Sequence, residues 1–255
     1  METFFPLLTP AELGLAVLVA ILAGFVKGVV GFAMPLVFIS GLTMFMSPEL
    51  ALAGLIAPTL ATNAFQALRQ GVPAAVRSTV EFKVFLGVGG VALLASAQLV
   101  REVPVRTMMA IIGVPVTFFA VLQLSGYQIK LARRSAAIET IAGAFAGVLG
   151  GMSGIWGPPT VAYLTALNTP KHDQMRVQGV IYGLGAVALM VAHTGSGVLR
   201  AETIGFSIAM VPTALIGVRM GMSVMNRIDQ AAFRRATLFV LCMAGLNLMR
   251  RAWFG

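Results

Sequence analysis

Apolar stretches separated by short polar ones run along the whole chain, and most are too long to be strands. They cover residues 11–26, 31–46, 48–68, 84–100, 107–126, 137–149, 155–167, 177–199, 203–222 and 231–249. A helix needs roughly 20 apolar residues to cross the hydrocarbon of a bilayer. The stretches that reach or approach this length are 48–68, 84–100, 107–126, 177–199, 203–222 and 231–249. The pattern predicts an all-α polytopic membrane protein.

The remaining stretches form two pairs, 11–26 with 31–46 and 137–149 with 155–167, and every member is short. A glycine-rich turn joins the two members of each pair. Short segments interrupted by glycine and proline at matching places in two halves are typical of broken helices at a transporter's binding site. We therefore expect each half to hold one broken, re-entrant-type helix pair and about three spanning helices.

The two glycine-rich turns are copies of one motif. Residues 23–38 read AGFVKGVVGFAMPLVF, and residues 146–161 read AGVLGGMSGIWGPPTV. At one constant offset the matching residues are Gly24 with Gly147, Gly28 with Gly151, Gly31 with Gly154, and Pro35 with Pro158. Repetition at a single register predicts an internal duplication. The expected parts are a first transmembrane repeat at 1–126, a polar linker at 127–136 and a second repeat at 137–255.

The number of crossings sets the relation between the repeats. If each pair is a re-entrant hairpin, each half crosses the membrane an odd number of times, and the same holds if each pair is two short spans. Either alternative inverts the second copy relative to the first. The prediction is therefore two inverted-topology repeats, as in many transporters.

Composition agrees with a lipid environment. Hydrophobic residues make up 58% of the chain and charged residues only 11%, against about 25% charged in soluble domains. The single cysteine, Cys242, excludes an intramolecular disulfide, and no metal or other cofactor is expected. The net charge of +9 lies in short loops without a basic, aromatic-rich face, so a nucleic-acid partner is not expected. A homo-oligomer remains open.

Basic residues predict the orientation, because lysine and arginine accumulate in cytoplasmic loops. One side collects Arg69, Arg77, Lys83, Lys130, Arg133, Arg134, Lys171, Arg176, Arg219, Arg227, Arg234 and Arg235. The other side collects Arg101, Arg106, Arg200, Arg250 and Arg251. This asymmetry predicts a multi-pass protein of a cell inner membrane with a cytoplasmic linker and both termini outside.

The glycine-rich turns have the features of an anion site. The second helix of each pair begins near Gly31 or Gly154, which leaves unpaired N–H groups and a positive dipole end deep in the membrane. Glycines also allow the backbone to approach a ligand closely. Pro35 and Pro158 fall in the first turns, where a missing N–H costs little. Close helix packing is the alternative explanation for the glycines.

Polar side chains near the turns are further candidates for substrate binding. Lys27 lies in the first turn region, and an intramembrane lysine is a functional candidate unless it snorkels to the interface. Asn63 and Gln66 share one helix face and either line the path or bond between helices. In the second turn, Ser153 and Trp156 could donate hydrogen bonds, although a tryptophan also serves as an interfacial anchor.

The acidic residues all fall near segment ends or in loops, so no carboxylate relay for Na⁺ or H⁺ is evident. Export of an anion from a negative-inside cell is favourable by about 2.3 kcal/mol per 100 mV and needs no coupling ion. The absence of a relay therefore favours export. His193 is the one candidate proton carrier, and an ordinary interfacial histidine is the better interpretation.

The motifs AGFVKGVVGFAMP and AGVLGGMSGIWGPP resemble those of the sulfite exporter TauE/SafE family of membrane transporters. The resemblance covers essentially the whole chain. It implies a small anionic substrate such as sulfite, sulfoacetate or another sulfonate. Carried over by position, it also implicates Gly28, Gly31, Pro35, Gly151, Gly154 and Pro158. Lys27, Val29 and Val30 depart from the family's glycine-rich pattern.

Two other classes stay open. GMSG at 151–154 followed by His193 resembles the Ser–His dyad of rhomboid intramembrane proteases, but a tetrapeptide is weak evidence and the duplication would be unexplained. We therefore do not expect an enzyme. Paired half-helices could also line an anion channel.

Overall fold

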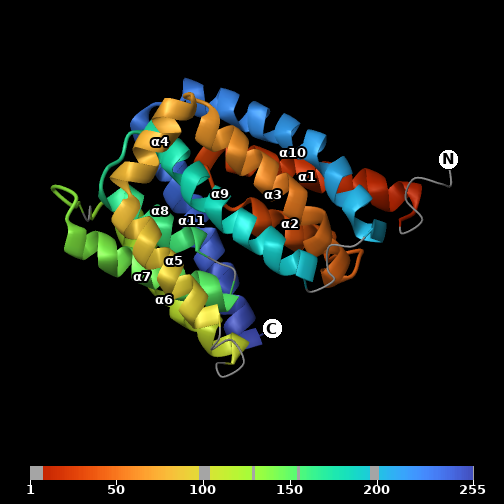
Figure 1. The fold of residues 1–255 in the computed structure, drawn as a ribbon, viewed down its shortest axis with the longest axis horizontal. Helices are drawn as coiled ribbons and strands as arrows, with labels where there is room; N and C mark the ends of the chain where they lie inside the picture. The colour runs from red at the N-terminus through yellow and green to blue at the C-terminus, as the bar shows by residue number, and fades with distance from the viewer. Residues whose placement is uncertain (1–7, 98–103, 128–129, 154–155, 196–200, 255) are drawn as a thin grey trace. The chain divides into compact units, whose positions relative to one another are not determined.

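The computed structural model describes residues 8–97, 104–127, 130–153, 156–195 and 201–254. Every regular element in these ranges is an α-helix (Figure 1). The helices are α1 (Pro10–Val30), α2 (Met34–Leu42), α3 (Pro48–Leu68), α4 (Val72–Glu81), α5 (Lys83–Ala97), α6 (Val105–Leu124), α7 (Ala136–Ser153), α8 (Gly157–Ala166), α9 (Lys171–Gly195), α10 (Ala201–Arg227) and α11 (Gln230–Phe254). The predicted all-α class is confirmed.

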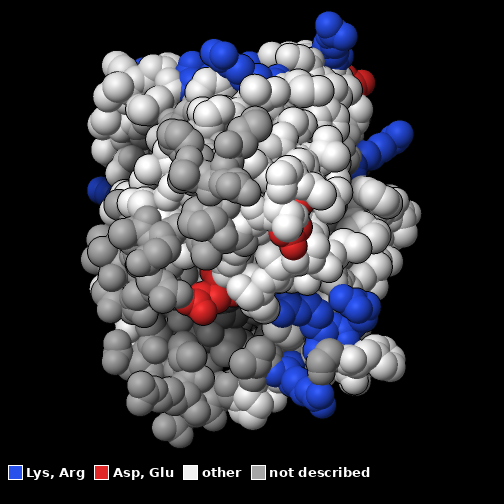
Figure 2. All heavy atoms as spheres, turned by 90° about the vertical axis from the view of Figure 1, so that its right-hand side faces the viewer, with Lys and Arg blue, Asp and Glu red and all other residues white. Residues whose placement is uncertain are grey.

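Several helices are suited to a membrane. Within the described residues α1, α3, α10 and α11 are long and apolar enough to cross it, and α4 with α5 forms one further candidate bent by 72°. Large apolar side chains such as Leu18, Phe118 and Ile141 point outward. On the described part of the face shown in Figure 2, charged residues form a few separate patches among uncharged ones. The chain is a multi-pass membrane protein.

The helices form two compact units, and the first contains residues 1–71 and 175–229. In it α1 packs on α10, α3 also packs on α10, and α2 packs on α1 and α3. Small residues permit this: a Cβ at Gly24 or Gly28 would overlap the backbone of α10, and one at Gly217 or Gly221 would overlap that of α1. Close backbone approach is how helices associate in lipid. Phe38, Met34 and Phe206 fill the core beside these helices, and the remaining large members are Leu42, Leu55 and Met210.

The second unit contains residues 72–174 and 230–255. Here α5 packs on α7, α6 packs on α11, and α8 contacts α6, α7 and α11. The α5–α7 contact again uses glycines, since a Cβ at Gly147 would overlap Gly89 and one at Gly151 would overlap Leu93. Phe85 of α5 and Tyr163 of α8 stack with ring centroids 5.8 Å apart. Arg134 forms a salt bridge of 2.9 Å with Glu139 of α7.

Each unit draws helices from both predicted repeats, so the compact units and the repeats at 1–126 and 137–255 are different divisions of the chain. The repeats themselves stay a prediction. α3 has the predicted bounds, but α1 does not end at residue 26: it continues through Lys27 to Val30 and is long enough to cross a membrane alone. The prediction of a short first segment was wrong because a buried, hydrogen-bonded lysine can extend an apolar helix. α4 was missed because it is a largely exposed helix that carries Arg77 and Glu81.

Candidate functional site: a buried polar cluster at the first helix break

The first helix break lies between α1 and α2 in the first unit. Gly31 caps the C-terminus of α1 in the left-handed region at φ 87°, and Ala33 follows at φ 70°. α2 then begins at Met34 with Pro35 in its first turn and without a side-chain cap. Two left-handed residues close together reverse the chain here, and the first of them requires glycine because a side chain at positive φ is strained. The break was predicted at this place, and α2 starts three residues later than expected.

Lys27 occupies the last turn of α1 and is only 3% exposed. Its Nζ donates to Thr62 Oγ1 at 3.0 Å and to Asn63 Oδ1, both on α3. Thr62 can accept this bond because its own hydroxyl donates to the Pro58 carbonyl at 2.7 Å. Lys27 therefore does not snorkel to a surface but is held between two membrane helices.

The surroundings of Lys27 are polar but uncharged. Within the described residues Lys27 bonds to the neutral side chains of Thr62 and Asn63 and to no carboxylate. An ammonium group has three N–H donors, and Thr62 and Asn63 account for two. A buried cation without a counter-charge is costly unless a ligand supplies one. The site is therefore suited to an anion.

Gln66 extends the cluster by one turn of α3. Its Nε2 donates to the Gly31 carbonyl at 3.1 Å and to the Met175 carbonyl of α9 at 2.7 Å. Both partners are carbonyl oxygens, which fixes the orientation of the amide. Gln66 Oε1 is buried and has no hydrogen-bond partner. Gln66 thus ties α3 to the helix break and to α9.

Gln178 of α9 lies against the same break, because a Cβ at Gly31 would overlap Gln178 Oε1. The Gln178 side chain is fully buried, and neither its Oε1 nor its Nε2 has a partner. Each unsatisfied buried polar group costs about 1–3 kcal/mol. An amide with both functions free is explained if it bonds a ligand or water when the site is occupied. Sequence reasoning did not assign Gln178 to the site; its signal was a glutamine within an apolar helix.

The other predicted residues differ in their surroundings. Gly28 and Gly151 lie against the backbones of α10 and α5, so close packing accounts for both. Pro158 is in the first turn of α8, as expected. Trp156 precedes α8 in the second unit and packs over Gly150, where a Cβ would lie 3.0 Å from the indole. Ser153 ends α7, but its side chain and Gly154 fall outside the described residues, as does the His193 side chain.

Apolar spanning helices with a buried cation and free amide groups at a helix break describe a membrane protein of the transporter class. The sequence comparison agrees, because the family model of the sulfite exporter TauE/SafE matches residues 16–248, nearly the whole chain. The chain belongs to this family of membrane transporters. No curated protein and no solved structure matches it.

Proposed function

We propose that the protein carries a small sulfur-containing anion, such as sulfite, sulfoacetate or another sulfonate, out across a cell inner membrane. The observation that carries the proposal is Lys27, a buried lysine with neutral partners and no carboxylate beside it among the described residues. Family membership supports the substrate class. Export is favoured because the negative-inside potential drives an anion outward by about 2.3 kcal/mol per 100 mV.

In this proposal the anion lies beside the third N–H of Lys27, at the break between α1 and α2. The uncapped N-terminus of α2 contributes a positive dipole end close to Met34. Gln178 Nε2 is a further donor without a partner. Gln178 Oε1 and Gln66 Oε1 are free acceptors, which suits an anion that carries a proton or a bound water.

The helix pairing supports two inverted repeats. If the segments of the two halves correspond in order, α1 corresponds to α7, the α4–α5 pair to α10, and α6 to α11. The α1–α10 contact in the first unit then has its equivalent in the α5–α7 contact of the second, and α6–α11 pairs two equivalent helices. Exchange of equivalent helices between units is what interlocked inverted repeats produce.

The decisive experiment measures uptake of labelled sulfite and sulfoacetate by inside-out vesicles that contain Lys27 variants. Lys27→Ala should weaken apparent affinity by roughly 5- to 150-fold, since a hydrogen bond to a charged group contributes about 1–3 kcal/mol. Lys27→Arg should retain part of the activity, and Lys27→Glu should lose more than Lys27→Ala because it repels the anion. Lys130→Ala, at an exposed lysine, is the matched control. Equal affinities across the Lys27 series would remove it from the site.

A channel is the second candidate, because half-helices that meet within the membrane can line a pore. A carrier should show counterflow and saturate at modest substrate concentration. Flux that rises without saturation and lacks counterflow would favour the channel.

The proposed orientation has its own test. With Cys242 replaced by serine, a cysteine introduced beside Arg134 should resist an impermeant thiol reagent in intact cells. Labelling of that cysteine from outside would reverse the orientation, with the linker outside and both termini inside.

A further inference from the structure

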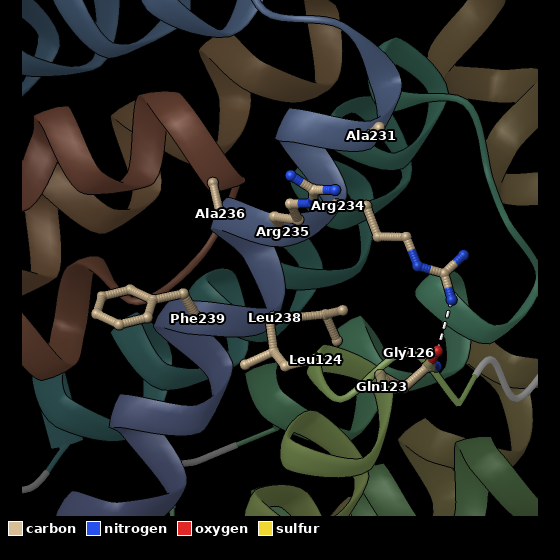
Figure 3. A pocket seen from close by; sticks show the side chains of 9 residues that line it. All are labelled: Gln123, Leu124, Gly126, Ala231, Arg234, Arg235, Ala236, Leu238 and Phe239. Carbon is tan, nitrogen blue, oxygen red and sulfur yellow. Dashed lines mark hydrogen bonds between the residues drawn. The ribbon is translucent and has the colours of Figure 1, made fainter.

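A pocket of about 550 Å³ opens at one end of α6 and α11 in the second unit (Figure 3). It is lined by Gln123, Leu124, Gly126, Ala231, Arg234, Arg235, Ala236, Leu238 and Phe239. All of these residues belong to the same unit and none is acidic. The pocket therefore combines two cations with an apolar wall.

The two arginines differ in how they are held. Arg234 reaches across to α6 and donates to Gln123 Oε1 at 2.5 Å, with a longer bond of 3.4 Å to Asn168 Oδ1 (Figure 3). Arg235 is exposed, and among the described residues it has no hydrogen-bond or ion-pair partner. No acidic residue lines the pocket, so no carboxylate of the lining compensates the two positive charges.

Arginines at both ends of α11 indicate the depth of the pocket. Arg235 and Arg250 are 15 residues apart, which corresponds to about 22 Å along a helix. Apart from Thr237 and Asn247 the residues between them are apolar, and the hydrocarbon of a bilayer is about 30 Å thick. Long arginine side chains extend outward from such positions to the headgroups. The pocket therefore lies at the boundary between hydrocarbon and headgroups.

The wall of the pocket continues toward the lipid. Phe239 is 60% exposed and Leu124 is 41% exposed, although both lie in apolar helix segments. Leu238, by contrast, is buried and closes the inner side. A ligand that fits must present a negative group to the arginines and a hydrocarbon chain to Phe239 and Leu124.

We propose that this pocket binds an anionic phospholipid, with the phosphate of its headgroup on Arg234 and Arg235 and an acyl chain along Phe239 and Leu124. The planar fork of an arginine matches two phosphate oxygens, and basic pockets between membrane helices suit such headgroups. A free phosphate could use the arginines but would gain nothing from the apolar wall. The pocket belongs to the second unit and Lys27 to the first, so the lipid site does not depend on the proposed function.

The test compares thermal unfolding of the full chain in detergent with added phosphatidylglycerol, phosphatidylcholine of the same acyl chains, or inorganic phosphate. Phosphatidylglycerol should raise the unfolding temperature more than either alternative. Arg235→Gln should remove most of this difference. Arg251→Gln, at an exposed arginine in the last turn of the same helix, should retain it. Arg235 is the main target because Arg234 also bonds to Gln123 and its loss could destabilise the unit directly.

A second variant tests the apolar half of the pocket. Phe239→Ser should weaken the effect of phosphatidylglycerol without changing that of inorganic phosphate. Equal stabilisation by the two lipids, an unchanged lipid effect in Arg235→Gln, or full stabilisation by phosphate alone would each overturn the proposal.

Discussion

The two helix breaks share a packing scheme but differ in chemistry. At the first, Gly24 and Gly28 of α1 lie against the backbone of α10. At the second, the matching Gly147 and Gly151 of α7 lie against the backbone of α5. Helix packing therefore explains these four glycines, and a difference in chemistry between the two breaks has to come from the positions where the motifs differ.

Those differences occur as a set. Lys27 corresponds to Gly150, and its partners Thr62 and Asn63 correspond to Gly185 and Ala186 at the same offset. The second copy thus lacks the cation and both of its hydrogen-bond acceptors. The two motifs share their glycines, while among the described residues only the first motif carries a buried lysine.

A second exchange concerns side-chain size at the breaks. The small Ala33 of the first break corresponds to Trp156 of the second, and the indole packs over Gly150. The first motif has the long side chain of Lys27. The second has Gly150 at the matching position, and the ring of Trp156 covers it. A space-filling role explains Trp156 without any ligand.

The largest expected effect tests the shared packing. Gly28→Leu and Gly151→Leu should each lower the free energy of unfolding by at least about 3 kcal/mol, because the new side chain would overlap backbone rather than a flexible side chain. Urea or thermal unfolding in detergent would measure the loss. Gly14→Leu, in open space on α1, is the control. If only one of the two glycines is sensitive, the two contacts are not equivalent.

The next prediction distinguishes the backbone strain at Gly31 from the overlap of a new side chain with its neighbours. Gly31→Leu should abolish transport, because a side chain is strained at φ 87° and would overlap Gln178. Gly126→Leu is the matched control, since Gly126 has φ 99° but a Cβ added there would meet no atom within 4 Å. The Gly126→Leu variant should lower the free energy of unfolding only through backbone strain, by about 1–2 kcal/mol. Normal transport by the Gly31 variant at normal insertion would contradict a role for this turn.

Replacing Gln178 should have smaller effects, which are opposite in sign for stability and for substrate affinity. Gln178→Leu should raise the free energy of unfolding by about 1 kcal/mol, because it removes an amide with no partner. If the amide bonds the substrate, the same variant should bind the anion several-fold more weakly. Thermal unfolding and substrate affinity, measured on one preparation, test both parts. Gains in stability with unchanged affinity would leave Gln178 outside the site.

The smallest effect belongs to the second break. Gly150→Ala should lower the free energy of unfolding by less than about 1 kcal/mol, because the Trp156 side chain has only to shift by a few tenths of an ångström. Transport should be unchanged. Trp156→Phe should restore the lost stability in the double variant. A large transport defect in Gly150→Ala would indicate that the second copy also takes part in the chemistry.

Much of the fold could be predicted because lipid imposes one rule, that apolar stretches become helices. The bounds of α3 and the break after Gly31 follow from composition and from glycine with proline. The end of α1 could not be predicted, because it depends on Thr62 and Asn63, which satisfy Lys27 from another helix. Long-range hydrogen bonds of this kind leave no local signal in the sequence.

For the candidate site, residue type predicted Lys27, Asn63 and Gln66, which the fold brings together at one break. Gln178 was not predicted because α9 contributes it from more than 100 residues further along the chain. Its importance depends on the absence of a partner, and a missing hydrogen bond becomes visible only in three dimensions.

The contact between α1 and α10 also sets an order for biogenesis. α3 ends at Leu68 and α10 begins at Ala201, so these two residues are 133 positions apart. At about 5–20 residues per second, a ribosome needs roughly 7–27 s to synthesise this interval. Throughout that time the glycine face of α1 has no partner helix, whereas Lys27 already has Thr62 and Asn63 on α3. Lys27 therefore gains its hydrogen-bond partners early during insertion. A nascent chain arrested before α10 would leave the glycine face of α1 without a partner helix, but Lys27 would already be hydrogen-bonded.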